Sequence, residues 1–317
     1  DALVADGEKL PEALKAEIGS TAALLKAEAM FALGREPDAL GQLQKVRSDF
    51  PKSDAAVYSY IVEADHYAKH DKTVEAQPLL TKLVDEFPGN TYAPYALYQA
   101  ALQAERRGQD ANYIEANKLI EQLVTRYPRS DLVFYARLKQ GDLLRKLNQF
   151  PQAQQVYETL VNNFSQHSDV LVAQLALAEC HNAQAAADPG HAEAAATLFE
   201  HLRDRGDAPV DLRVEAGYNL GYTLARRSQV ARAQQVWWQD VVKAFLLNRD
   251  LAAQLGAKGR YWMARTLLEL GASFEQQAKL EEARNAWSLI LKTKLPGEAL
   301  ARARLARFGP NAIAERT

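Results

Sequence analysis

Residues 134–164, FYARLKQGDLLRKLNQFPQAQQVYETLVNNF, contain the pattern that decides the fold. Apolar residues recur every three or four positions from Phe134 to Leu147 and again from Gln152 to Phe164, as in two amphipathic helices. Between them, residues 148–151 (Asn-Gln-Phe-Pro) have the composition of a short turn. Pro151 suits the first turn of a helix, where its missing N–H has no intrahelical partner to lose. The stretch therefore predicts a helix, a tight turn and a second helix.

The end of this unit recurs along the chain. An aromatic residue followed by proline closes an apolar helical stretch at Phe50-Pro51, Phe87-Pro88 and Tyr127-Pro128, and Phe164-Ser165 keeps the aromatic residue. Successive aromatic residues are 37, 40 and 37 positions apart, and weaker versions of the marker are Leu10-Pro11 and Leu295-Pro296. Proline cannot extend a helix and restricts the residue before it. The marker therefore indicates a helix pair that repeats at a nearly constant period.

A second pattern places small residues where the two helices of a pair approach closely. Gly141 is followed by Ala153 after 12 positions, by Tyr157 after four more and by Leu160 after three more. The last three residues share one face of the second helix. The same offsets give three further sets, of four, four and three residues: Ala27, Ala39, Leu43 and Val46; Ala64, Ala76, Leu80 and Leu83; and Gly221, Ala233 and Trp237.

These residues resemble the tetratricopeptide repeat pattern over nearly the whole chain. The resemblance implies an all-α fold, an α-α superhelix in which antiparallel helix pairs stack as a solenoid. We expect one solenoid over residues 1–317, with about seven helix pairs and a last helix: 21–51, 54–88, 91–128, 131–165, 168–206, 210–247 and 255–296, then 297–308. The chain departs from the family pattern in three ways. It lacks the Trp usual early in the first helix, most of its periods exceed the usual length of about 34 residues, and its later units lose the closing pair or lengthen a loop, as at residues 187–190.

The resemblance also implies where a ligand binds. In the family, the first helix of each pair lines a concave surface that holds an extended or helical peptide. Transfer of these positions to the chain gives this set: Tyr58, Ile61, Asp65, Lys69, Tyr95, Tyr98, Leu102, Glu105, Arg106, Tyr135, Leu138, Asp142, Arg145, Lys146, Tyr218, Tyr222 and Arg226. Tyrosine offers a large rigid contact, and arginine binds a carboxylate with two hydrogen bonds. The alternative is that the tyrosines pack between helices and the charges form a solvated face.

Composition excludes several classes of protein. The 317 residues carry 38 Lys and Arg against 40 Asp and Glu, without the basic run expected of a nucleic-acid-binding protein. No apolar stretch approaches the roughly 20 residues that cross a bilayer. The single cysteine, Cys180, excludes an intrachain disulfide, which does not distinguish the cytoplasm from a periplasm.

Motifs of catalysis, of metal binding and of cofactor binding are missing as well. The chain has no glycine-rich phosphate loop, nucleophile elbow or His-Glu-x-x-His helix, so we expect neither an enzyme nor a cofactor. His66 and His70 share a helix face, but without a third ligand two exposed histidines are the favoured interpretation. Cys180-His181 with His191 is a weaker metal candidate still. Trp237 and Trp238 point about 100° apart on a helix, so Trp238 covers a neighbouring unit or lies in an interface.

The leading hypothesis is a non-catalytic scaffold that binds a peptide or partner protein. The Phe-Pro-x-Ser/Asn form of the marker resembles that of bacterial envelope repeat proteins, namely the outer-membrane-assembly lipoproteins and the Tol-Pal-associated coordinator proteins. The resemblance implies a periplasmic or envelope location, with the cytoplasm as the alternative. Leu10-Pro11 and the start at Asp1 instead suit a spacer or self-association segment of a longer repeat array. A third hypothesis is the helical arm of a larger enzyme.

Overall fold

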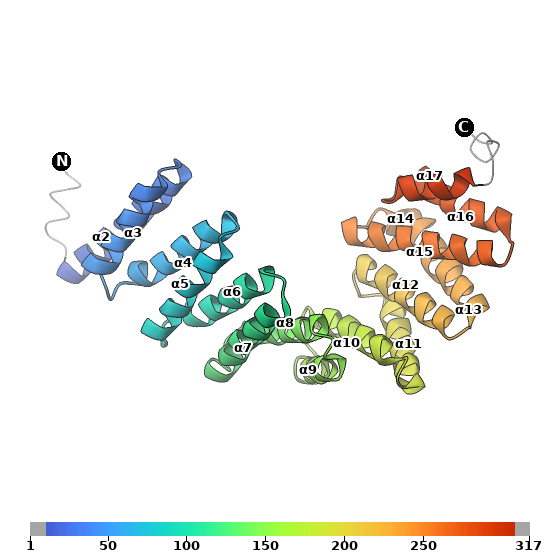
Figure 1. Ribbon diagram of the computed structural model, residues 1–317, viewed down its shortest axis with the longest axis horizontal. Helices are drawn as coiled ribbons and strands as arrows, with labels where there is room; N and C mark the ends of the chain where they lie inside the picture. The colour runs from blue at the N-terminus through green and yellow to red at the C-terminus, as the bar shows by residue number, and fades with distance from the viewer. Residues whose placement is uncertain (1–10, 308–317) are drawn as a thin grey trace. The chain divides into compact units, whose positions relative to one another are not determined.

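The computed structural model describes residues 11–307, and 79% of these are helical. Over this range the chain has sixteen α-helices, one π-helical segment and no strand (Figure 1). The predicted all-α class is confirmed. Leu10 of the weak marker and residue 308 of the expected last helix lie outside the described residues.

The chain divides into two compact units, Asp1–Gln149 and Phe150–Thr317. In the first unit, each helix packs against the next in chain order. Its helices are α2 (Glu12–Ala32), α3 (Glu36–Asp49), α4 (Asp54–Lys69), α5 (Thr73–Glu86), α6 (Ala93–Arg106), α7 (Asp110–Arg126) and α8 (Val133–Lys146). The first helix therefore begins nine residues before the expected pair at 21–51.

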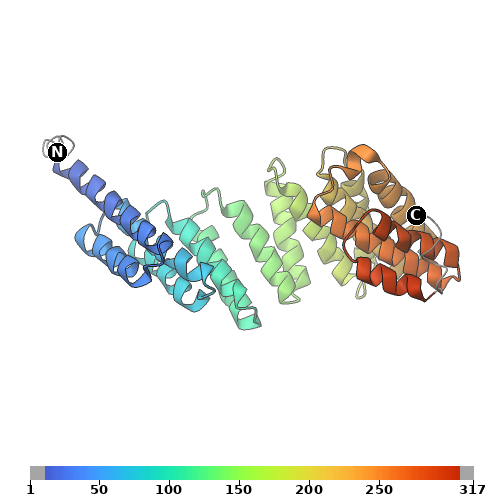
Figure 2. The ribbon, with the colours of Figure 1, turned by 90° about the horizontal axis from the view of Figure 1, so that it is seen from above.

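The second unit continues the helix pairs, and α15, α16 and α17 lie side by side in Figure 2. Its helices are α9 (Phe150–Asn163), α10 (Val170–Gln184), α11 (Pro189–Asp204), α12 (Val210–Arg226), α13 (Val230–Gln235), η1 (Val236–Leu246), α14 (Arg249–Ala252), α15 (Ala257–Gln276), α16 (Leu280–Lys292) and α17 (Glu298–Ala306). Pro189 and Gly190 lie in the first turn of α11 rather than in the expected loop, because Asp188 caps the helix through the Gly190 N–H at 2.8 Å. One continuous solenoid over residues 1–317 stays a prediction.

The aromatic-proline marker folds as a tight turn between pairs. The Phe50 carbonyl accepts a hydrogen bond from the Ser53 N–H at 3.0 Å, and Ser53 Oγ then caps α4 through the Ala56 N–H at 3.1 Å. The same bond, from the third residue after the aromatic residue, forms at Phe87, Tyr127 and Phe164. The serine or asparagine two positions after the proline thus links the end of one helix pair to the start of the next. This role explains why the marker recurs once per pair.

The turn inside five of the helix pairs uses a left-handed residue. Gly34, Asp71, Asn148, Ser228 and Ala278 all have φ between 57° and 72°. After each of them the next N–H bonds to a carbonyl five residues earlier, at 2.8–3.0 Å, as in a Schellman motif. These five pairs therefore close in the same way even where glycine is absent.

Ala278→Gly is expected to stabilise the second unit by roughly 0.5–1 kcal/mol, because the left-handed conformation strains alanine but not glycine. All four tryptophans, Trp237, Trp238, Trp262 and Trp287, lie in this unit, so denaturation followed by tryptophan fluorescence measures its unfolding. The control Ala231→Gly, at an exposed position of α13, should lower stability by a similar amount. A loss of stability in both variants would contradict the assigned turn.

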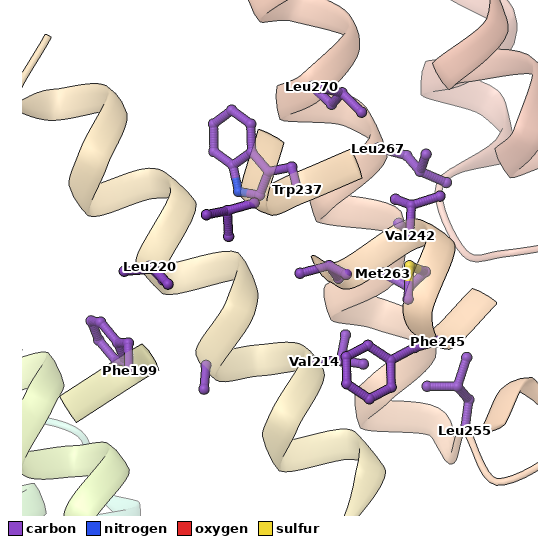
Figure 3. Close-up of a cluster of buried hydrophobic side chains, with 14 of the residues drawn as sticks. Phe199, Val214, Leu220, Trp237, Val242, Phe245, Leu255, Met263, Leu267 and Leu270 are labelled. Carbon is purple, nitrogen blue, oxygen red and sulfur yellow. The ribbon is translucent and has the colours of Figure 1, made fainter. Parts of the chain in front are cut away.

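The predicted register of small residues is confirmed by burial. The two four-residue sets that start at Ala27 and Ala64 are buried, as are Gly221, Ala233 and Trp237. Two further buried sets follow the same offsets and were not predicted: Ala104, Ala116, Ile120 and Leu123; and Gly271, Ala283, Trp287 and Ile290. A Cβ atom on Gly221 would lie 2.5 Å from Trp237 Cδ1, so only glycine admits the indole against α12. Figure 3 shows Trp237 beside α12 in the core of the second unit.

The sixth pair departs from regular α-helix in its second helix. Residues Val236–Leu246 are wound as a π-helix, and the Leu247 N–H bonds to the Val242 carbonyl at 3.1 Å. The wider turn admits one extra residue. As a result the buried aliphatic residue of this pair is Val241, while Asp240, which has the expected offset, bonds to Arg203 at 3.0 Å.

Candidate functional site

We call the first helix of each pair its A helix, and the surface formed by Tyr58 of α4, Tyr95 and Tyr98 of α6 and Tyr135 of α8 the A-helix face. The first three of these side chains are half-buried, and Tyr135 is 37% exposed. The Tyr58 ring lies 5.2 Å from that of Tyr92. Ile61, which was expected on this face, is instead 1% exposed and belongs to the core.

Electrostatic contacts link residues of neighbouring A helices in the first unit. The pKa of Tyr95 is raised by burial and then by Asp65 and Tyr58, both on the neighbouring α4. The pKa of Tyr98 is likewise raised by burial and then by Glu105 and by Asp142 of α8. Predicted residues of α4, α6 and α8 therefore lie near one another, as a shared face requires.

Glu105 is fully occupied by contacts within the chain. Its carboxylate pairs with Lys139 at 3.0 Å and with Lys146 at 2.8 Å. Burial disfavours the charged form, but the hydrogen bonds from Lys146 and Lys139 outweigh it, so the pKa of Glu105 lies below its ordinary value. Glu105 thus joins α6 to α8, and it is not available to a ligand without breaking these pairs.

Arg106 has a similar role between α6 and α4. It donates to Asp71 Oδ1 at 2.7 Å and to the Ala68 carbonyl at 3.1 Å, at the end of α4. Asp142 and Arg145 are half-buried on α8. The alternating charges predicted for the groove are therefore largely engaged in contacts between neighbouring helices.

Asp65 is the exception among the predicted carboxylates. It is half-buried, and the structure records no hydrogen bond or ion pair for it with any residue it describes. Burial raises its pKa although Lys69 opposes the shift. Glu28 of α2, which lies 37 residues before Asp65, was missed because no groove positions were assigned to the first pair. The period itself is the signal that would have found it.

Of the two tyrosines predicted in the second unit, only one is accessible. Tyr218 is 4% exposed, and its hydroxyl accepts a hydrogen bond from Arg265 at 3.1 Å. Its ring lies 4.9 Å from Trp262 and 6.1 Å from Tyr222, which is 37% exposed. Burial favours the packing interpretation for Tyr218. The contribution of Trp262 and Arg265 of α15 was not predicted. The pair before α15 does not end in the aromatic-proline marker, and no groove positions were assigned to α15.

A hollow in the second unit is lined by residues of η1, α15 and α16. Trp237 is buried, whereas Trp238 is half-buried and lines a hollow of about 450 Å³ with Phe274 and Leu289. Trp238 also packs against the core of the second unit. It therefore covers a neighbouring helix and borders a surface hollow at once.

The histidines of the two candidate metal pairs contact other groups of the chain. His66 stacks on Phe31 with ring centroids 4.1 Å apart, and His70 Nδ1 lies 2.8 Å from the His66 carbonyl oxygen. His181 and His191 share a hydrogen bond of 2.8 Å between their Nδ1 atoms, and Cys180 is buried. Within residues 11–307, no three His, Cys, Asp or Glu side chains gather as a metal-binding group. Nor is any helix of that range both long and apolar enough to cross a membrane.

Comparison with known proteins agrees with this architecture. The family model of the tetratricopeptide repeat matches residues 21–53 and 135–167. A tetratricopeptide repeat protein from Parabacteroides merdae has a TM-score of 0.51 at 12% identity, over 89% of this chain and 96% of that chain. The C-terminal part of a repeat-containing protein from Cytophaga hutchinsonii has a TM-score of 0.50 at 19% identity, over 77% and 82%. No curated protein matches the chain significantly.

The fold is that of the tetratricopeptide-like solenoids, and the two matched segments support the tetratricopeptide repeat family. Such repeats suggest a scaffold for protein–protein interaction. These matches concern the repeat family as a whole. Membership of the type found among envelope lipoproteins and Tol-Pal coordinators stays a prediction.

Proposed function

We propose that the protein is a non-catalytic scaffold that holds a peptide segment of a partner on the A-helix face. The observation that carries the proposal is the row of half-exposed tyrosines on α4, α6 and α8. Tyrosine combines a large apolar surface with a hydroxyl group at a low cost in side-chain entropy. The neighbouring charges are mostly paired, so the rings are the principal groups left to contact a partner.

The charge pairs support the proposal in a second way. Lys139 and Lys146 hold Glu105 between α6 and α8, and Arg106 holds the end of α4. These contacts fix the helices that carry the tyrosines relative to one another. A face that is rigid before binding loses less conformational entropy when the partner arrives.

Hydroxyl-radical footprinting tests the proposal with a peptide selected from a displayed random library on the whole chain. Tyr95 and Tyr98 should be oxidised in the free protein and protected by the peptide, because both rings are half-exposed on the A-helix face. Tyr261 of α15, 46% exposed in the second unit, should stay reactive, and the buried Tyr157 should stay unreactive throughout. Protection confined to Trp238 would move the site to the hollow of about 450 Å³ and overturn the proposal.

We also propose an envelope location in a bacterium, on the strength of the Phe-Pro-x-Ser/Asn markers at residues 50–53, 87–90 and 127–130. Fractionation of the native host with an antibody against the chain tests this. Recovery in the cytoplasmic fraction would contradict it and leave the binding proposal intact.

A further inference from the structure

A hollow of about 520 Å³ lies in the first unit, where α2 and α4 pack together. This volume falls within the range of roughly 300–1,000 Å³ that ligand-binding clefts have. Its lining combines aromatic rings with carboxylates: Phe31, Tyr58 and His66 with Glu28, Glu36 and Asp65. Tyr58 and Asp65 belong to the A helix α4, so the hollow is continuous with the A-helix face.

One of the three carboxylates is already partnered. Glu36 Oε1 lies 3.6 Å from Lys72 Nζ and 3.4 Å from His66 Nε2. This contact with His66 is the main cause that lowers the pKa of Glu36. Glu36 therefore contributes to the wall of the hollow, and its charge is balanced within the chain.

Glu28 and Asp65 are different. Both are half-buried, and neither has a hydrogen bond or ion pair with any residue that the structure describes. The pKa of Tyr58 is raised by burial and then by Glu28 and Asp65, and all three residues line the same hollow. Two unpaired carboxylates thus flank one tyrosine at the wall of the hollow.

Burial of a carboxylate without a partner costs free energy, because its charged form loses hydration. Glu105 provides the comparison within the same unit. It too is half-buried, but Lys139 and Lys146 neutralise it. Lys69 follows Asp65 by one helical turn and reduces the shift in the pKa of Asp65, but it is exposed and makes no ion pair within 4.0 Å among the described residues. Glu28 and Asp65 therefore lack a cationic partner among the described residues.

We propose that this hollow binds an arginine side chain of the peptide that the A-helix face holds. The inference rests on the proposed function and names one feature of the peptide. A guanidinium group donates hydrogen bonds in the plane that suits carboxylates such as Glu28 and Asp65, and its face stacks on aromatic rings such as Phe31 and Tyr58. Lysine carries the same charge but lacks a planar group with several N–H donors, so arginine matches this lining better.

The test begins with peptides selected from a displayed random library on the whole chain. The strongest arginine-containing peptide is then synthesised with arginine and with citrulline, which is nearly isosteric but uncharged. On the parent protein, citrulline should weaken binding at least tenfold in titration calorimetry. On the Glu28→Gln/Asp65→Asn variant the two peptides should bind with nearly equal affinity, because the charge they differ in has lost its partners.

A matched control and a stability measurement separate binding from folding. Asp85→Asn, at an exposed position of α5, should keep the full preference for arginine. Because the pKa of Asp65 is raised in the folded state, its ionisation opposes folding above its unfolded pKa. Asp65→Asn should therefore leave the melting temperature at neutral pH equal or higher, and the difference should vanish below the unfolded pKa of the carboxyl.

Two outcomes would overturn the inference, and they are distinguishable. If peptides bind, lose affinity when Tyr98 is truncated, and show no dependence on arginine or on Glu28 and Asp65, the arginine site is wrong and the proposed function stands. If no peptide protects the A-helix face, the proposed function fails and the arginine site fails with it.

Discussion

Gly221→Leu is expected to destabilise the second unit by at least about 3 kcal/mol. Even the first carbon of the new side chain would lie 2.5 Å from Trp237 Cδ1 and closer still to Nε1. The indole has little room to retreat, because it is 2% exposed and its N–H bonds to the Tyr218 carbonyl at 3.1 Å. Leucine would therefore push α12 and the following helix apart and break that bond.

Urea denaturation followed by tryptophan fluorescence measures this effect, since every tryptophan lies in the second unit. Gly206→Leu is the control in the same unit, because Gly206 is exposed and has nothing within 4 Å of its added Cβ. The control should stay within about 0.5 kcal/mol of the parent. Equal stability of both variants would mean that the contact between Gly221 and Trp237 is assigned wrongly. Gly141→Leu, at the same register position, is expected to be similarly costly on the sequence pattern alone.

Much of the fold could be predicted because its determinants are local or periodic. The turn at Phe50 depends on residues within three positions of the aromatic ring, and the close contact of a pair depends on an offset of 12 residues. Such signals repeat, so each repeat supports the interpretation of the others. The missed set at Gly271 obeys the same rule, and a systematic search with these offsets would have found it.

Other features of the fold depend on distant contacts. The π-helix of Val236–Leu246 moves the buried aliphatic residue from the expected position, Asp240, to Val241. Asp240 instead meets Arg203, which lies 37 residues earlier and is almost fully buried. No pattern within the helix indicates that Asp240 pairs with Arg203, so the shift of the buried position to Val241 could not be predicted from periodicity.

The candidate site was predictable as a face but not as a set of charges. Tyr95, Tyr98 and Tyr135 follow from their places on the A helices. Whether Glu105 and Asp65 are paired does not follow from the sequence, because pairing depends on which cations of neighbouring helices reach each carboxylate. Glu105 meets two lysines across a helix boundary and Asp65 meets none among the described residues, although the sequence predicted both at equivalent surfaces.

Replacing Tyr98 and Tyr135 together by alanine is expected to weaken binding of the selected peptide at least tenfold. Buried aromatic anchors commonly cost about 2 kcal/mol or more when they are truncated at an interface. The two rings come from α6 and α8, and Asp142 of α8 lies near Tyr98, so one extended peptide crossing these helices would meet both. Titration calorimetry with the parent and the variant gives the ratio of affinities.

The melting temperature of the same variant distinguishes a binding role from a packing role. Tyr135 is 37% exposed and Tyr98 is half-buried, so the fold should largely survive the double substitution. The control Tyr261→Ala removes an exposed tyrosine of the second unit and should leave the affinity unchanged. A large fall in melting temperature would show that the rings hold the helices together. Unchanged affinity in a folded double variant would exclude the A-helix face and make the hollow beside Trp238 the next surface to test.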